Sequence, residues 1–261
     1  MSYATGMILP HQPLLLESIG KTHRKGLEKT LTAMVLAAQH LHASLADVLM
    51  ILSPHGSLMS HHFFVNINSR YQTDYASFGN YSDKKTYKTD IELVNAFTRM
   101  AGEQENITII SDNTLDYAIS IPLDLLFQLQ KPLPIIPINT CMASLQQHYE
   151  FGIKLQEIVH STNKRVAILA SADLSHKLTP DAPAGYNQEA VAFDEEIINM
   201  LQRQETQKIL ELHEETLQDV GECGLRPIAV LLGCLAASSY SFERFSYEYP
   251  FGIGHLVAEL R

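Results

Sequence analysis

The stretch Leu49-Met-Ile-Leu-Ser-Pro-His-Gly-Ser57 decides the expected fold of this chain. Its apolar part, from Val48 to Leu52, is typical of a strand buried on both faces of a sheet. Pro54 cannot continue a hydrogen-bonded ladder, and Gly56 permits a tight turn. We therefore expect a central strand that ends just before His55. In open α/β sheets, ligands bind beyond that end of the strands.

Two further apolar runs are followed by a histidine. Gly6-Met-Ile-Leu-Pro-His11 repeats the Pro-His ending, and the run Val166 to Ala170 leads into Ser171-Ala-Asp-Leu-Ser-His176. One β-α-β unit separates His11 from His55, so parallel neighbouring strands would bring both imidazoles within reach of one ion. Imidazole is a common ligand of Fe, Zn, Cu and Ni. The alternative is that these histidines only form hydrogen bonds within loops.

The segment Gly221-Glu-Cys-Gly224 offers two candidates for a third metal ligand. Glu222 would complete a set of two histidines and one carboxylate, which suits Fe(II) and leaves positions open for substrate and O₂. Cys223 would supply a thiolate and favour a softer site. A glutamate that only stabilises a helix N-terminus is the remaining interpretation of Glu222.

Two side chains after the third run are candidates for proton transfer. His176 has the side chain best suited to general acid or base catalysis near neutral pH. Asp173 would either orient a catalytic ring or cap a turn. No GxSxG motif accompanies Ser175, and no P-loop, GxGxxG or HExxH motif occurs in the chain.

Composition narrows the class of protein. The chain has 261 residues and a formal net charge of -10, which argues against binding to nucleic acid or to an anionic membrane surface. Its three cysteines form no CxxC pair, which argues against a disulfide framework. No apolar run reaches the roughly 20 residues of a membrane helix. We expect a soluble cytoplasmic protein.

Helical and strand-like patterns alternate along the chain, which favours one α/β domain over residues 1–261. We expect a three-layer α/β/α arrangement around a central, mostly parallel sheet. The spacing of apolar residues predicts, among others, the following segments: a loop from Pro10 to Gly20, a long helix from Thr22 to Leu45, a long loop or an excursion at the sheet edge from Ser69 to Asp90, a helix with Pro122 in its first turn, a helix from Glu205 to Leu217, a helix from Ile228 to about Ala237, and closing strands from Phe242 to Tyr249 and from Ile253 to Leu260.

Six short motifs, in this order and spacing, resemble the class III extradiol ring-cleavage dioxygenases, the superfamily of the protocatechuate 4,5-dioxygenase β subunit. The resemblance spans most of the chain and is strongest to the branch described as AMMECR1-linked or Memo-like. The motifs are Ile8-Leu-Pro-His-Gln-Pro-Leu14, Leu52-Ser-Pro-His-Gly56, Leu115-Asp-Tyr-Ala-Ile-Ser-Ile-Pro-Leu123, Ser171-Ala-Asp-Leu-Ser-His176, Glu222-Cys-Gly-Leu-Arg-Pro227 and Pro250-Phe-Gly252.

The resemblance implies a non-haem Fe(II), with Zn as the alternative metal, held by His11, His55 and a third ligand. Glu222 would match the ring-cleaving enzymes and is the preferred third ligand, whereas Cys223 would match the Memo-like branch. His176 would match the acid/base histidine of the family. The implied substrates are a catechol-like aromatic compound and O₂, and the family forms homo-oligomers.

One motif departs from the pattern of the ring-cleaving members. They usually read Asp-His-Gly where this chain has Asp116-Tyr117-Ala118. Tyr117 would bind substrate or donate a proton, although a phenol with a pKa of about 10 is a poor acid/base at neutral pH. The alternative function is therefore a Memo-like metal-binding protein without ring cleavage, which acts in redox signalling or as a binding module.

Overall fold

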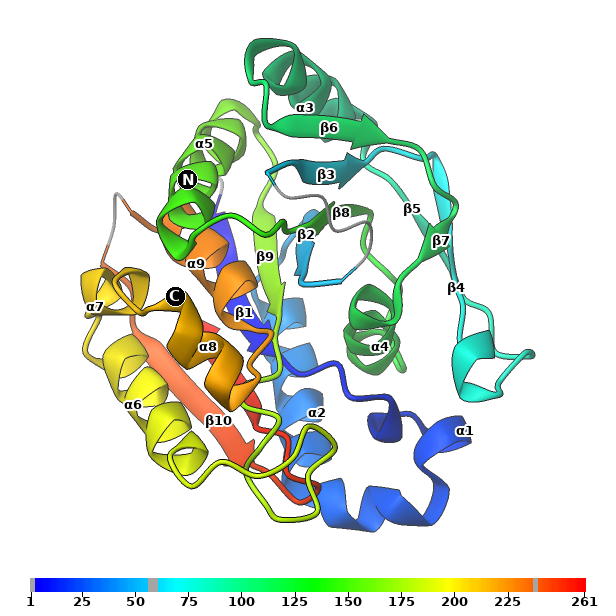
Figure 1. Cartoon of the computed structure of the whole chain (residues 1–261). Helices are drawn as coiled ribbons and strands as arrows, with labels where there is room; N and C mark the ends of the chain where they lie inside the picture. The colour runs from blue at the N-terminus through cyan, green and yellow to red at the C-terminus, as the bar shows by residue number, and fades with distance from the viewer. Residues whose placement is uncertain (1–2, 56–60, 237–238) are drawn as a thin grey trace.

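A computed structural model describes residues 3–55, 61–236 and 239–261, and within them eight strands form one large, mostly parallel sheet (Figure 1). In spatial order the strands are β10 (Phe242–Glu248), β11 (His255–Leu260), β1 (Tyr3–Leu9), β9 (Val166–Ser171), β2 (Val48–Ser53), β8 (Ile135–Asn139), β3 (Phe63–Asn66) and β6 (Ile107–Ile110). The four central strands β1, β9, β2 and β8 are parallel. The mixed α/β class with a mostly parallel central sheet is thus confirmed.

The register of the central strands brings their carboxyl ends to one edge of the sheet. Leu9 pairs with Ser171, and Ser53 pairs with Asn139. The segments that follow these strands therefore begin at one level. Gly56, which is predicted to turn the chain after His55, lies outside the described residues.

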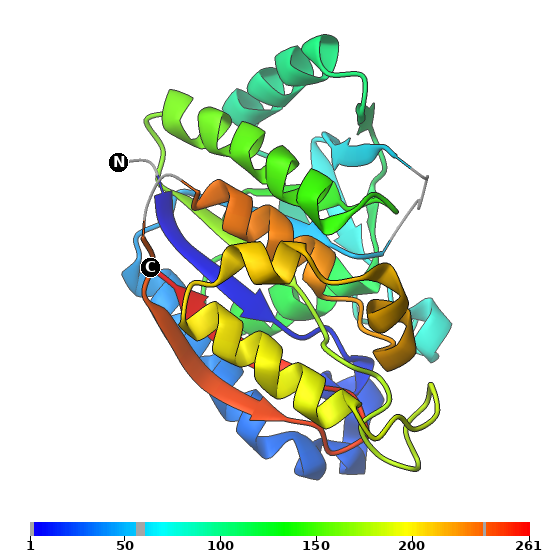
Figure 2. The same ribbon diagram turned by 60° about the vertical axis from the view of Figure 1, so that its left-hand side comes forward.

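Helices cover both faces of the sheet, as Figures 1 and 2 show. Apolar side chains from α5, α6 and α9 pack on one face, and those from α2 and α4 pack on the other. Val48 to Leu52 contributes alternate side chains to both clusters, as expected for a strand buried on both faces. The α-helices are α1 (Glu17–Gly20), α2 (Glu28–Ala43), α3 (Ile91–Glu103), α4 (Tyr117–Leu126), α5 (Leu145–Ser161), α6 (Ala190–Gln202), α7 (Thr206–Leu210), α8 (Glu214–Val220) and α9 (Leu225–Cys234).

Of the two alternatives for Ser69 to Asp90, the long loop is wrong, because strands of a second, small sheet occupy much of this segment. This small sheet has the order β5 (Thr86–Lys88), β4 (Arg70–Thr73) and β7 (Thr114–Leu115), with a 3₁₀ turn at Ala76–Phe78. Its polar residues conceal a core of tyrosines: Tyr71, Tyr75 and Tyr87 are each about 1% exposed. In these strands buried tyrosines alternate with exposed polar side chains, and this alternation of tyrosine and polar residues is the only trace of them in the sequence.

The predicted helix from Thr22 to Leu45 is too long. A 3₁₀ segment occupies Lys21–Leu27, and α2 begins only at Glu28. Gly26 lowers the helix propensity there, and the ring of Phe251 packs where a side chain at Gly26 would lie. The predicted loop before it also contains short helical turns, at Pro13–Leu15 and in α1.

Three other helix boundaries differ from the sequence prediction. Pro122 lies inside α4 rather than in its first turn, because the carboxylate of Asp116 caps the helix one turn earlier. The helix predicted from Glu205 to Leu217 is divided into α7 and α8. Helix α9 begins at Leu225, and the predicted end at Ala237 lies outside the described residues.

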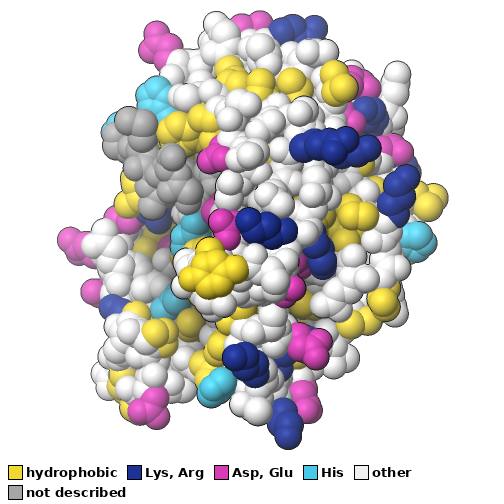
Figure 3. All heavy atoms as spheres, turned by 90° about the vertical axis from the view of Figure 1, so that its right-hand side faces the viewer, with side chains coloured by type: hydrophobic (Ala, Val, Ile, Leu, Met, Phe, Trp, Pro, Cys, Tyr) yellow, Lys and Arg dark blue, Asp and Glu magenta, His cyan; other side chains and the backbone are white. Residues whose placement is uncertain are grey.

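The surface of the described part of the chain is mixed in character. On the face that carries α1 and the small sheet, acidic and basic side chains are interspersed (Figure 3). In the described residues, no helix combines the length and apolar character needed to cross a membrane.

Candidate metal centre

The two Pro-His endings bring His11 and His55 together at the carboxyl edge of the central sheet. Their Nε2 atoms lie 3.2 Å apart, and their rings meet edge to face at a centroid distance of 5.0 Å. His11 is 2% exposed, whereas His55 is partly exposed. The two strands that precede these histidines are parallel, as expected, but they are not neighbours, because β9 lies between β1 and β2 in the sheet.

The hydrogen bonds of His11 fix its tautomer. Its Nδ1 lies 3.0 Å from Ser171 Oγ, and that hydroxyl donates its proton to the carbonyl oxygen of Ala118. Ser171 can therefore only accept from His11, so the proton of the neutral ring sits on Nδ1. The Nε2 atom of His11 is left with a lone pair that points at His55.

Several electron-rich atoms converge on that lone pair. Cys223 Sγ lies 3.6 Å and Asp173 Oδ2 lies 3.4 Å from His11 Nε2. Burial, with smaller effects from His55 and His176, lowers the pKa of His11 well below its ordinary value, so the ring is not the cation of this cluster. A metal ion bound by His11, His55 and Cys223 would satisfy these lone pairs, and their donor atoms all lie within 4.8 Å of one another.

The two candidates for the third ligand have different surroundings. Cys223 belongs to the donor group with His11 and His55, and Glu222 does not. The Oε2 atom of Glu222 instead accepts the backbone N–H of Leu225 at 2.7 Å, in the first turn of α9. Burial raises the pKa of Glu222 to about 7. Its Oε1 is buried without a hydrogen-bond partner among the described residues.

Cys223 directly precedes the N-cap of α9, and it lies close to the strand ends because Gly224 allows the chain to approach them. A side chain at Gly224 would overlap Ala172 and the carbonyl oxygen of Asp173. The Cys223 thiol lies 3.6 Å from that same carbonyl oxygen. Burial and the neighbouring carboxylates of Asp173 and Glu222 raise the pKa of the thiol well above its ordinary value. A thiol in this position ionises when a metal cation replaces its proton.

A polar network holds the segment that carries His55. Asp116 accepts hydrogen bonds from Ser53 Oγ at 3.0 Å and from the Asn139 side chain at 3.1 Å, while it caps α4. The same Asn139 amide donates to the backbone carbonyl of His55. Asp116 and its partners were not predicted as site residues, although an aspartate directly before a helical run is a recognisable N-cap signal.

Tyr117 faces His55 from the first turn of α4. Its hydroxyl lies 3.1 Å from His55 Nε2, and the two rings stack at 4.9 Å. Phe78 packs edge-on against the other side of the phenol. Burial, and then the negative charges of Cys223, Asp173 and Asp116, raise the pKa of Tyr117 to about 12. The phenol therefore stays protonated at neutral pH and can donate a hydrogen bond.

Asp173 and His176 follow β9 at the same edge. Asp173 Oδ1 accepts the backbone N–H of His11 at 3.1 Å, so this carboxylate positions His11. Together with Cys223, the donor atoms of Asp173 and His176 form a second group within 4.8 Å. The Nδ1 atom of His176 is buried and has no hydrogen-bond partner among the described residues. All seven predicted site residues thus lie in or beside one cluster.

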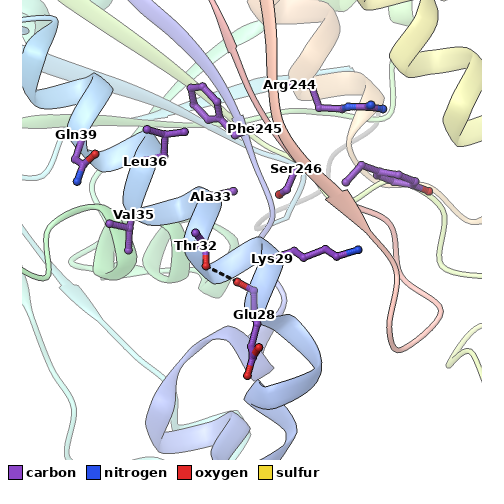
Figure 4. A pocket seen from close by; sticks show the side chains of 11 residues that line it. Glu28, Lys29, Thr32, Ala33, Val35, Leu36, Gln39, Arg244, Phe245 and Ser246 are labelled. Atoms are coloured by element: carbon purple, nitrogen blue, oxygen red, sulfur yellow. Dashed lines mark hydrogen bonds between the residues drawn. The ribbon is translucent and has the colours of Figure 1, made fainter.

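Two other features of the described residues are less suited to chemistry. His40, Glu243 and Glu259 form a third donor group, but the Arg261 guanidinium already neutralises both carboxylates. A groove of about 880 Å³ runs between α2 and β10 (Figure 4). Its lining, which includes Val35, Leu36 and Phe245 but no histidine or cysteine of the described chain, contains none of the predicted site residues.

Comparison with known proteins shows the family to which this chain belongs. A family model described as the catalytic LigB subunit of aromatic ring-opening dioxygenase matches residues 5–258. Protein CA_C1420 of Clostridium acetobutylicum is 27% identical over 97% of this chain, and the chain spans 56% of the length of that relative. The crystal structure of the uncharacterized protein JW3007 of Escherichia coli K12 superimposes with a TM-score of 0.69 at 14% identity, covering 99% of this chain and 100% of the other.

Proposed function

Because the chain belongs to the family of catalytic LigB subunits of aromatic ring-opening dioxygenases, we propose that it is a metal-dependent dioxygenase that opens a catechol-like ring in the extradiol mode. The family implies an aromatic substrate and O₂ in general terms, and the metal, the substrate and the mode of cleavage are our proposal. We further propose that residues 1–261 form a single three-layer α/β/α domain and that the protein is a homo-oligomer.

The observation that carries this proposal is the convergence of possible metal-ligand atoms from His55, Cys223 and Asp173 on His11 Nε2. We assign His11, His55 and Cys223 as the metal ligands and iron as the metal, with zinc as the alternative. Glu222, the ligand preferred from the sequence, is not assigned, because its carboxylate caps α9. Bound Fe(II) would supply redox chemistry with O₂ and polarise the oxygen atoms of the substrate.

The surrounding side chains have distinct tasks in this proposal. His176, whose buried Nδ1 lacks a partner among the described residues, holds or releases a proton beside Asp173 and Cys223. The Tyr117 hydroxyl donates a hydrogen bond beside His55. Asp173 binds the amide of His11 and keeps that ligand in place.

Oxygen consumption by iron-loaded protein tests the proposal. Protein purified without oxygen is loaded with Fe(II) and assayed with a panel of catechols, and ring opening is followed by the absorbance of the yellow product. We expect one equivalent of iron and O₂ uptake that depends on substrate. His55→Ala and Cys223→Ser should lose both, while Glu222→Gln should retain iron. Stoichiometric iron without O₂ uptake on any catechol would contradict the dioxygenase assignment.

A second function is favoured by the environment of Tyr117 and Cys223. A phenol with a pKa of about 12 occupies the place where the resemblance implies a histidine acid, and a thiol rather than a carboxylate lies with the two histidines. We propose as the alternative a Memo-like metal-binding protein that does not cleave rings. It predicts tight metal binding by the wild type and no turnover of catechols, including by a Tyr117→His variant.

A further inference from the structure

A histidine outside the predicted set lies at the same edge of the sheet. His255 is the first residue of β11, which runs antiparallel to β1, so its beginning meets the end of the parallel strands. The sequence argument considered only histidines that follow a strand, whereas His255 begins one. The side chain is 0% exposed, and both of its ring nitrogens are buried without a partner among the described residues.

The backbone before His255 is joined to the segment that carries Asp173. The amide of Gly254 donates to the carbonyl of Ser175 at 2.8 Å, and the carbonyl of Gly254 accepts the amide of Leu174 at 2.8 Å. These bonds form where β1 has ended and no longer separates β11 from β9. A side chain at Gly254 would overlap the carboxylate of Asp194, so only glycine permits this approach.

A hydrogen-bond donor without a partner in the described chain and a carboxylate that can accept from it are thereby brought into one buried region. A neutral imidazole always carries one N–H, and His255 has no acceptor for it. Asp173 Oδ1 accepts the His11 amide, and Oδ2 lies 3.4 Å from His11 Nε2, a nitrogen that carries a lone pair and has no proton to donate to it. Burial lowers the pKa of His255 to about 4, with Asp173 as the strongest opposing influence, so the ring is neutral at physiological pH.

We propose that His255 is a positioning residue of the metal centre, whose ring N–H holds the Asp173 carboxylate in place through an ordered buried water. Asp173 in turn fixes the backbone of His11, so the effect of His255 reaches the metal ligands indirectly. The inference rests on the proposed metal site. Buried polar groups are nearly always paired, and a histidine kept unpaired only for packing would be better replaced by an apolar residue.

Cobalt binding and thermal unfolding together test this role. His255→Leu removes the ring N–H that the proposal pairs with Asp173, so the metal-free protein should lose stability, by about 2–4 °C in Tm for each kcal/mol lost. Its affinity for Co²⁺ should fall about 10- to 100-fold, the usual effect of losing an outer-shell partner, and the visible spectrum of bound Co²⁺ should shift. His255→Asn or His255→Gln restores a donor, and at least one of them should recover affinity and spectrum.

His148 provides the matched control. It is also 0% exposed, but its Nδ1 donates to the Ser144 carbonyl at 2.8 Å and its Nε2 accepts the Cys141 amide. His148→Leu should lower Tm and leave Co²⁺ affinity unchanged. The proposal is overturned if His255→Leu leaves Co²⁺ affinity unchanged, or if neither amide variant recovers affinity. Wild-type protein that takes up no stoichiometric Co²⁺ would remove the metal centre itself, and this proposal with it.

Discussion

His11 Nδ1 donates a hydrogen bond to Ser171 Oγ over 3.0 Å, and the serine hydroxyl donates its own hydrogen bond to the Ala118 carbonyl. This pair of hydrogen bonds leaves the Nε2 lone pair of His11 free for a metal. Ser171→Ala should release the ring from its tautomer and orientation, so metal affinity should fall about 10- to 100-fold. Isothermal titration with Co²⁺ or Zn²⁺ measures the change.

Ser175→Ala is the control for this substitution. Ser175 is equally buried, but its hydroxyl donates to Asp194 at 2.5 Å rather than contacting His11. The variant should lose stability and keep its metal affinity. Equal affinities for Ser171→Ala and the wild type would show that Ser171 does not orient His11.

Neighbouring substitutions at the start of α9 separate the two candidate third ligands. Cys223→Ser should reduce metal content to a small fraction of one equivalent, because Cys223 Sγ lies among the donors around His11. Glu222→Gln should retain metal, since the amide oxygen still caps α9. Elemental analysis after dialysis measures both. Metal retained by Cys223→Ser and lost by Glu222→Gln would restore the carboxylate ligand preferred from the sequence.

Removal of the Tyr117 hydroxyl should affect turnover more than metal binding. Tyr117→Phe keeps the ring that stacks on His55 but removes the hydroxyl at 3.1 Å from Nε2. Loss of a positioned proton donor typically lowers kcat about 10²- to 10⁴-fold. We expect kcat to fall toward that range while metal content stays at the wild-type level. An unchanged kcat on the best catechol would exclude a catalytic role for the hydroxyl.

The network around Asp116 should stabilise both helix α4 and the segment that carries His55. Asp116→Ala removes the cap of α4 and leaves the buried Ser53 and Asn139 side chains without their acceptor. Loss of the cap alone costs about 1 kcal/mol, and the unpaired groups add to it. Denaturant unfolding should show a loss of at least that size. Asp112→Ala, which removes the acceptor of a single exposed Thr114 amide, is the control and should change stability little.

Buried neutral histidines should make the protein sensitive to acid. Burial lowers the pKa of His148 to about 4, against about 6.5 in an unfolded chain. Between these values the unfolded state binds a proton that the folded state does not, so stability is lost as the pH falls from about 6.5 to 4. The contribution of one such group has a slope of up to about 1.4 kcal/mol per pH unit.

Comparison of wild type with His148→Gln isolates this contribution, because Gln has a donor and an acceptor but does not titrate. Urea unfolding at several pH values should give a smaller decline for the variant below pH 6.5. Parallel curves for the two proteins would contradict the depressed pKa of His148.

Local patterns were sufficient to predict the strands of the central sheet and to propose most of the candidate site residues. Apolar runs that end in Pro-His predict buried strands, and parallel order brings their ends together, so His11, His55, Asp173 and His176 could be proposed from the sequence. The burial of the tyrosines in the small sheet could not be predicted from the sequence, because their neighbours are polar and their burial depends on distant parts of the chain. The choice between Glu222 and Cys223 was equally beyond the sequence.

The sequence by itself determined the strands of the central sheet and most of the helices, and it indicated the segments that carry the candidate metal-binding and proton-transfer side chains. These features depend on period, turn residues and short-range propensity, all of which are local. Only the tertiary structure decided which donor atoms face one another. Cys223 meets His11 because Gly224 lets α9 approach β9, and His255 joins the same edge because β11 runs antiparallel to its neighbour. Contacts between residues more than 200 positions apart depend on packing, which no local pattern encodes.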